Sequence, residues 1–248
     1  MNELLDYSVA EKRLYAFQEQ WLPPRVQGVT VASRALEELV LGMGVVRERL
    51  GIPPEAPVLL LYTRFFEFDQ ETLYRVFAEV FRRVPGVRLL VVGKGRQGEE
   101  ARLLAAARER GFANALVMAG WVEPVELPDY LAAGDVAIYP FADTLVNRAK
   151  CPAKLTELLR AGVPVVADGV GQIPEYVAPE LHGLLCAPDD WQAMVAKCVA
   201  LLGDAQRQQS AGAAARAFVL AKFAWRQHAE RLHNFYIQGI ANSQLRSR

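Results

Sequence analysis

The feature that most constrains the fold is a regular alternation of short apolar runs with longer amphipathic segments. The apolar runs are predicted to be strands, at Val58–Tyr62, Val87–Val92, Ala115–Met118, Asp135–Tyr139, Val163–Ala167 and Gly183–Cys186. The segments between them are predicted helices, at Asp69–Arg83, Gly98–Gly111, Glu126–Ala133 and Ala153–Ala161. Continuously apolar strands that alternate with helices are typical of a parallel sheet covered on both faces. We therefore predict an α/β protein with a doubly wound, Rossmann-like parallel sheet.

The two ends of the chain follow different patterns. After the last strand the sequence predicts only helices, at Trp191–Leu202, Ala205–Lys222 and Trp225–Gly239. Before the first strand it predicts a single helix-strand-helix piece, at Ser8–Trp21, Gly28–Ala32 and Ser33–Leu41. One strand with two helices buries too little apolar surface to fold alone, and the proline-rich stretch Ile52–Pro57 follows it as a natural boundary. We divide the chain into an incomplete N-terminal piece (residues 1–50), a main domain (residues 51–222) and a C-terminal helix and tail (residues 223–248).

Composition excludes several classes of protein. The chain has 28 Lys and Arg residues against 28 Asp and Glu residues, so no net charge attracts nucleic acid, and a phosphate must be met by a local cluster of charges. No apolar run is long enough to span a membrane, and the charged N-terminus does not resemble a signal peptide. The three cysteines and three histidines share no metal-ligand spacing. We expect a cytoplasmic protein without a metal site.

A glycine-rich loop follows the second strand of the main domain. Residues 93–98 match the pattern GxGxxG between a strand and a helix, which is typical of dinucleotide-binding proteins. However, the strand about twenty residues later, Ala115–Met118, lacks the terminal acidic residue that would bind a ribose. The pattern alone therefore favours close approach of a ligand to the backbone at Gly93 and Gly95 more than it favours NAD chemistry.

Two groups of charged residues are placed to bind phosphate. Arg64 directly follows the first strand, at the edge of the sheet where parallel α/β folds bind ligands. Lys150 and Lys154 lie at the predicted start of the helix Ala153–Ala161, where backbone amides and cations together attract anions. Glu157 follows Lys154 by three residues, and this spacing alone favours an ordinary helical ion pair.

An aromatic cluster follows Arg64 directly. Phe65, Phe66 and Phe68 belong either to the core or to a surface that contacts another part of the protein.

The order of several segments resembles a known family. The segments are "YTR", "VVGKG", "AGWVEPVELPDYLAAGDVAIYP", "CPAKLTELLRAGVPVVADGVGQIPEYV", "HGLLCAPDD" and "FAWRQHAERLHNFY". In this order they resemble the nucleotide-sugar-binding half of a GT-B glycosyltransferase of the retaining, family 4 type. The resemblance covers about Ala56 to Tyr236, and it lies in the succession of segments, since no short motif carries it alone.

The resemblance implies a role for particular residues. Arg64 matches the arginine that contacts the donor diphosphate. The lysine that usually follows it by about five residues is missing, and Lys154 is expected to replace it, so that Arg64 and Lys154 are the expected catalytic residues. Glu157 matches the glutamate that holds the ribose hydroxyls, whereas Ala149 replaces the other glutamate of that signature.

The expected donor contacts also include one further segment from the resemblance, together with the lysine and the glycines already singled out from the sequence. The backbone of Trp121 and Val122 is expected to contact the base, and Lys150, Gly93 and Gly95 complete the expected binding set. The donor is a nucleotide-diphospho-sugar, and no metal or other cofactor is expected.

The resemblance also implies that something is missing. A GT-B enzyme closes two Rossmann-like halves over its substrates, and this chain carries only the tail of the acceptor-binding half. We expect the chain to bind a nucleotide sugar and to transfer the sugar slowly or not at all, unless the missing half or a homodimer partner completes the site. Two alternatives remain open, a non-catalytic dimerisation module and an NAD-linked oxidoreductase.

Overall fold

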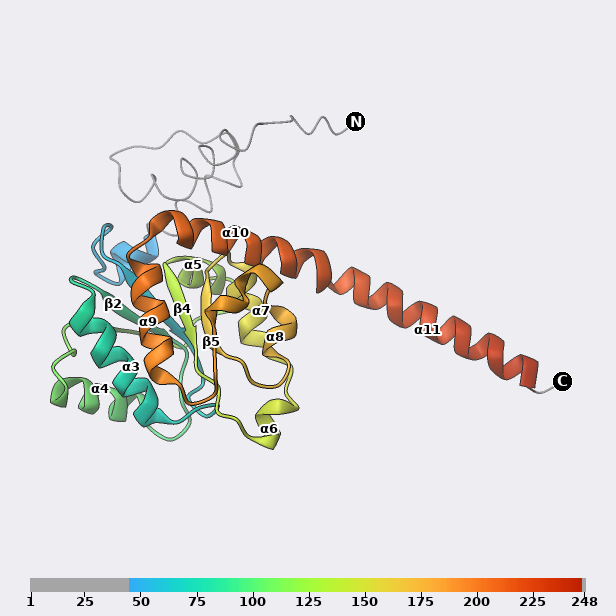
Figure 1. Ribbon diagram of the computed structural model, residues 1–248, viewed down its shortest axis with the longest axis horizontal. Coiled ribbons are helices and arrows are strands. Elements are labelled where there is room, and N and C mark those ends of the chain that lie inside the picture. The colour runs from blue at the N-terminus through green and yellow to red at the C-terminus, as the bar shows by residue number, and fades with distance from the viewer. Residues whose placement is uncertain (1–44, 247–248) are drawn as a thin grey trace, which may run out of the picture.

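The computed structural model describes residues 45–246, in which the six expected strands form one parallel sheet (Figure 1). The strands are β1 (Val58–Tyr62), β2 (Arg88–Val92), β3 (Leu116–Gly120), β4 (Val136–Tyr139), β5 (Val165–Asp168) and β6 (Leu185–Cys186). Each lies within two residues of its predicted bounds. The predicted helix-strand-helix piece, Ser8–Trp21, Gly28–Ala32 and Ser33–Leu41, lies outside the described residues.

Helices cover both faces of this sheet. The principal ones are α3 (Gln70–Arg83), α4 (Glu99–Glu109), α5 (Leu127–Ala132), α7 (Ala153–Arg160), α9 (Trp191–Leu202), α10 (Ala205–Lys222) and α11 (Trp225–Arg246). Three short helices that the sequence did not predict are α6 (Leu145–Arg148), α8 (Ile173–Tyr176) and the 3-10 helix η3 (Pro179–Leu184). These have at most six residues, which is too few to show a helical period in the sequence.

The apolar runs of the strands fill two cores. Leu59 and Leu61 of β1 point into the core shared with α3, α4 and α9, whereas Val58 and Leu60 point into the core shared with α5, α7 and α10. Successive residues of a strand face opposite sides, so a strand buried on both sides must be apolar throughout. This burial explains why the alternation of apolar and amphipathic segments predicted the fold.

The C-terminal helices pack differently from one another. Residue 212 of α10 must be glycine, since a Cβ there would lie 2.0 Å from the carbonyl oxygen of Gly162, at the turn between α7 and β5. The next helix, α11, extends away from the sheet (Figure 1) and exposes Leu232 and Phe235. It also continues past Gly239, where the sequence predicted its end.

The strand order, β3-β2-β1-β4-β5-β6, determines where a ligand can bind. From β1 the chain builds outward through β2 and β3, then returns to place β4 on the other side of β1. In open parallel sheets, the loops that leave the carboxyl ends of the strands diverge where the order reverses, and ligands bind in the crevice between them. Here that position is the carboxyl end of β1 and β4.

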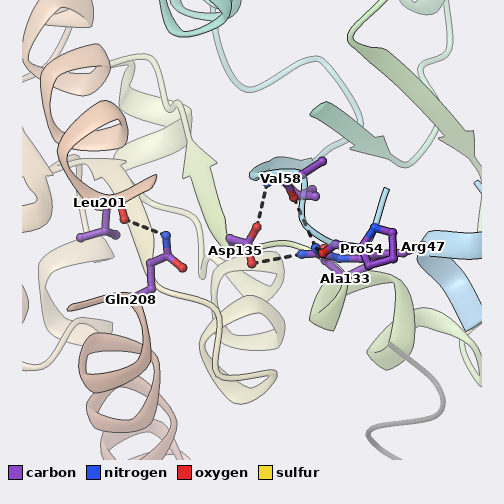
Figure 2. Close-up of polar contacts among 8 residues, drawn as sticks. Arg47, Pro54, Val58, Ala133, Asp135, Leu201 and Gln208 are labelled. Carbon is purple, nitrogen blue, oxygen red and sulfur yellow. Dashed lines mark hydrogen bonds and ion pairs between the residues drawn. The ribbon is translucent and has the colours of Figure 1, made fainter. Parts of the chain in front are cut away.

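The opposite end of β1 and β4 is closed by Arg47, which lies in the helical segment of residues 45–49 (Figure 2). Its guanidinium donates to the carbonyl oxygens of Ala133, Pro54 and Ala56 at 3.0–3.3 Å and to Asp135 Oδ1 at 3.0 Å. Asp135 Oδ2 in turn accepts from the amide of Val58 at 2.8 Å. Residues 45–49 therefore pack into the same body as the sheet.

Within this part of the chain, no helix has both the length and the apolar character needed to cross a membrane.

Candidate nucleotide-sugar site

Arg64 follows β1 at the position where the strand order reverses. Its Nε atom is buried and has no hydrogen-bond partner among the residues that the structure describes. The next residue, Phe65, has a φ angle of 66°, which is unusual for a residue other than glycine. The Thr63 hydroxyl, which accepts from the Phe65 amide at 2.8 Å, and Gln70, which donates to the Phe65 carbonyl at 2.6 Å, hold this conformation. Backbone strain of this kind clusters at binding sites.

Gly93 joins the loop after β1 to the loops after β2 and β3. A Cβ at residue 93 would lie 1.9 Å from the Thr63 carbonyl oxygen, and the φ angle of Gly93 is 116°, so only glycine fits. Its amide donates to the carbonyl oxygen of Gly120 at 2.7 Å. Gly93 thus brings three strand ends together at the rim that carries Arg64.

Two further amides of the glycine-rich loop are already bonded within the chain. Gly95 donates to Glu100 Oε1 and Gln97 donates to Glu99 Oε2, each at 2.7 Å. In a dinucleotide-binding protein, amides of this loop face the pyrophosphate. Two carboxylates of α4 take that place here, which argues against the NAD-linked alternative.

The Glu157 carboxylate interacts with Tyr62, the last residue of β1. Burial raises the pKa of Tyr62, and the charge of Glu157 and its hydrogen bond with the Tyr62 hydroxyl raise the pKa further, while Arg64 acts in the opposite direction. The phenol therefore stays protonated. Because Arg64 and Glu157 both act on this hydroxyl, the structure brings these two predicted residues together.

Tyr139 ends β4 beside Tyr62. Burial raises its pKa, and the negative charges of Glu67 and Glu157 add to the effect. The carboxylates of the loop after β1 and of α7 therefore both lie near the ends of the two central strands.

Lys154 forms an ion pair with Glu67, and the helical pair with Glu157 expected from the spacing is wrong. The distance between Lys154 Nζ and Glu67 Oε1 is 3.0 Å, and the two side chains are 16% and 11% exposed. Spacing along a helix cannot reveal this partner, because Glu67 lies on a loop 87 residues away.

Lys150 lies close to Lys154. Its Nζ donates to Asn147 Oδ1 at 3.0 Å and lies 4.8 Å from the centre of the Phe66 ring and 5.9 Å from that of Phe141. Lys154 Nζ lies 5.8 Å from the centre of the same Phe66 ring. Two ammonium groups therefore lie near one aromatic ring that is half exposed.

A further carboxylate, Asp168, ends β5 at the same rim. It accepts from the amide of Phe141 at 2.8 Å. Burial raises the pKa of Asp168 to about 6, and Asp189 and Asp190 contribute to the rise, although the Phe141 amide opposes it. Among residues 45–246, no group of three or more His, Cys, Asp or Glu side chains is arranged to hold a metal ion.

Comparison with known proteins shows the family. Residues 56–204 match the family described as glycosyl transferases group 1. The chain belongs to this family. A D-inositol 3-phosphate glycosyltransferase from Segniliparus rotundus is 31% identical over 205 residues, which are 80% of this chain and 44% of that protein.

A second relative comes from Corynebacterium glutamicum. It is a GDP-mannose-dependent monoacylated alpha-(1-6)-phosphatidylinositol monomannoside mannosyltransferase, 31% identical over 76% of this chain and 49% of its own length. The chain thus spans less than half the length of these two curated relatives.

Solved structures show the same glycosyltransferase fold. Sucrose-phosphate synthase from Thermosynechococcus elongatus superposes with a TM-score of 0.65 at 27% identity, covering 79% of this chain and 48% of the synthase. Anabaena Alr3699/HepE, solved with UDP and glucose, also has a TM-score of 0.65, at 22% identity over 78% of this chain and 52% of that protein. The sheet is therefore the Rossmann-like fold of a GT-B glycosyltransferase half.

The remaining predicted residues of this glycosyltransferase domain lie after β3. Trp121 is exposed, whereas Val122 is partly buried against the core under α5 and α7. They follow Gly120, whose carbonyl oxygen holds the Gly93 amide. The structure therefore places them at the same rim as Arg64, two strands away from β1.

Sequence reasoning missed four residues of this rim: Tyr62, Tyr139, Glu67 and Asn147. The two tyrosines each end a predicted strand at the ligand-binding edge, which was a usable signal. Glu67 lies in the segment where the family usually has a lysine. An acidic residue in that segment, together with a lysine expected to act from another part of the chain, could have predicted the Glu67–Lys154 pair. Asn147 gave none, because its bonds depend on how two loops meet.

Proposed function

We propose that this chain binds a nucleotide-diphospho-sugar at the carboxyl ends of β1 and β4, as the donor half of a retaining, family 4 type glycosyltransferase. Arg64 carries the proposal, because its buried Nε lacks a partner among the described residues. An unpaired buried donor is costly, and phosphate oxygens are acceptors that suit a guanidinium. The names of the relatives, which include a GDP-mannose-dependent enzyme, and the UDP-bound neighbour support a nucleotide sugar.

Different residues along the rim are assigned to different parts of the donor. Glu157 is exposed next to Tyr62, and its carboxylate can accept from both hydroxyls of a ribose. Trp121 and Val122 lie further along the rim and would flank the base.

The phosphate end of the donor is assigned to the basic residues of the rim. Arg64, Lys150 and Lys154 meet the diphosphate. Gly93 supplies the close backbone approach by allowing the tight contact with Thr63, whereas Gly95, whose amide is already bonded to Glu100, keeps the loop after β2 close to α4.

The charges suit the chemistry of sugar transfer. When the bond between the anomeric carbon and the diphosphate oxygen breaks, its electron pair goes to the departing nucleoside diphosphate. Cations held at that oxygen stabilise the charge as it develops. We propose that Arg64 and the lysines do this without a divalent ion, so treatment with EDTA should leave the affinity for the nucleotide unchanged.

Transfer to an acceptor requires more than this sheet. The chain spans less than half of the curated relatives, and a GT-B enzyme holds its acceptor in the other half. We propose that the chain alone binds the donor and transfers sugar slowly or not at all, until an acceptor-binding half or a homodimer partner completes it. A normal enzymatic rate with the isolated chain would contradict this.

The binding proposal is tested by calorimetric titration of UDP, GDP, ADP and NAD. One nucleoside diphosphate should bind the wild-type chain more tightly than NAD. Arg64→Met should weaken that binding by roughly 10- to 150-fold, the range for hydrogen bonds to charged groups. Glu157→Ala should weaken it by about 10-fold and should reduce the affinity for the nucleoside by the same factor, because Glu157 contacts the ribose.

The control variant is Arg216→Met, which removes an exposed arginine from α10. It should leave every affinity unchanged. Binding of NAD that is lost in Gly95→Ala and indifferent to Glu157→Ala would instead favour the oxidoreductase.

A further inference from the structure

The loop after β1 and the segment before α7 are joined at one residue, Glu67. Its carboxylate pairs with Lys154, and its carbonyl oxygen accepts from Asn147 Nδ2 at 2.8 Å and from the amide of Ala142 at 2.8 Å. Asn147 is itself buried, and its Nδ2 also donates to the carbonyl oxygen of Ala142 at 2.8 Å. Both the side chain and the backbone of Glu67 are therefore held in place.

Lys154 and Lys150 have different partners in this network of hydrogen bonds and ion pairs. Lys154 has its charge balanced by a carboxylate 3.0 Å away that is almost buried. Lys150 donates to the neutral amide oxygen of Asn147 and lies over the rings of Phe66 and Phe141. No carboxylate among the described residues forms an ion pair with Lys150. An amide and aromatic faces orient an ammonium group without neutralising its charge.

We propose that Glu67 and Asn147 are positioning residues that give the two lysines different tasks. Glu67 holds Lys154 in an ion pair that links the loop after β1 to the first turn of α7, and Asn147 presents Lys150 as the cation that meets the donor diphosphate. This inference rests on the proposed function and refines it, since that function alone assigns the diphosphate to both lysines.

The geometry gives the physical reason. An anion that approaches the Lys154 ammonium also approaches the Glu67 carboxylate, whose repulsion cancels much of the attraction. An anion near Lys150 meets a positive charge that no carboxylate among the described residues compensates. Removing the charge of Glu67 should therefore strengthen diphosphate binding, whereas damage to the structure would weaken it.

The experiment titrates UDP, GDP and ADP, and the nucleoside of whichever binds, against four variants. Lys150→Met should weaken diphosphate binding by at least about tenfold and leave nucleoside binding unchanged. Its affinity should also depend less on salt than that of the wild type. Lys150→Arg should restore most of the loss, because it restores the charge.

The other two variants separate positioning from structural damage. Glu67→Gln keeps an oxygen that Lys154 can donate to, and it should bind the diphosphate at least about twofold more tightly. Lys154→Met alone would strand a nearly buried carboxylate, so Lys154 is tested in the double variant Glu67→Gln/Lys154→Met, which removes both charges. The double variant should bind the diphosphate within about threefold of the wild type.

Lys222→Met is the matched control, because Lys222 also lies over an aromatic ring, 5.1 Å from the centre of Phe218, on α10. It should change no affinity. If the double variant loses more affinity than Lys150→Met, or if Glu67→Gln weakens binding, the division of tasks is wrong while the proposed function stands. If no diphosphate binds the wild-type chain, both the proposed function and this inference fall.

Discussion

The two ends of β1 each carry an arginine, and the two differ in how well their donors are satisfied. Arg47, at the start of the sheet, makes four hydrogen bonds with Ala133, Pro54, Ala56 and Asp135 (Figure 2). Arg64, at the carboxyl end, has a buried Nε with no partner among the described residues. An arginine whose three nitrogen atoms all have partners within the chain holds the fold together, whereas one with a buried nitrogen that has no partner is prepared for a ligand. The same residue type therefore has two functions, and the hydrogen-bond inventory distinguishes them.

The largest expected effect separates the two arginines by stability. Arg47→Met should lower the free energy of unfolding by about 3–5 kcal/mol, because it leaves Asp135 Oδ1 and several carbonyl oxygens without the guanidinium that donates to them. Arg64→Met should change it by at most about 1 kcal/mol, because it removes a donor that was already unsatisfied. Urea unfolding of both variants measures this difference. Equal losses of stability in the two variants would contradict the difference between Arg47 and Arg64.

The second prediction compares two strand-end carboxylates. Asp135 pairs with Arg47, whereas Asp168 accepts from the Phe141 amide and has no ion pair among the described residues. Burial raises the pKa of Asp168 to about 6, from an ordinary value near 4. A group with a raised pKa contributes its full stability below pH 4 and loses it as the pH rises through 6. Asp168→Asn should therefore gain up to about 3 kcal/mol relative to the wild type between pH 4 and pH 7.

Urea unfolding at several pH values checks this, with Asp69→Asn as the control of opposite sign. Partial burial tends to raise the pKa of Asp69, but hydrogen bonds from Thr72 at the start of α3 outweigh it and lower the pKa. Asp69→Asn should therefore lose stability relative to the wild type as the pH rises through 4. A pH-independent difference for Asp168→Asn would show that its carboxylate is not desolvated as the structure indicates.

The fold was largely predictable, because burial on both faces forces the strands to be apolar throughout. The strands and the long helices therefore appear directly in the sequence. The short helices α6, α8 and η3 were missed because a helix of one turn has no period to detect. In chain order all three lie between strands, α6 before β5 and α8 and η3 before β6, where local pattern gives the least information, and Figure 1 shows α6 and α8 at the edge of the domain.

The site was predictable only in part, for a reason that Lys154 illustrates. Its chemistry was expected from its place before a helix, but its partner was expected to be Glu157, three residues away. The structure supplies Glu67 from another loop, a choice that depends on how β1 and β4 are paired in the sheet. Similarly, the glycine-rich loop has the sequence of an anion site, yet Glu99 and Glu100 occupy two of its amides. Residue types were readable from the sequence, whereas their partners required the structure.

The smallest expected effect compares Arg47 with Arg49, which lies two residues further along the chain. Arg49 Nη1 donates to Glu126 Oε1 at 2.8 Å, a shorter contact than the 3.0 Å between Arg47 and Asp135. However, the Arg49 and Glu126 side chains are 48% and 45% exposed, so water can replace either partner. Glu126→Gln should therefore leave the urea midpoint unchanged, whereas the matched variant Asp135→Asn should lower it clearly.

The stability effects of Glu126→Gln and Asp135→Asn together show whether burial determines the strength of a charge pair in this chain. Glu126 precedes α5 without capping it through its side chain, so Glu126→Gln removes a charge and no helix cap. If Glu126→Gln destabilised the chain as much as Asp135→Asn, contact distance and not burial would set the value of a charge pair here. A buried donor without a partner would then be no more informative than an exposed one, and the unpaired Nε of Arg64 would lose its meaning as a sign of a ligand.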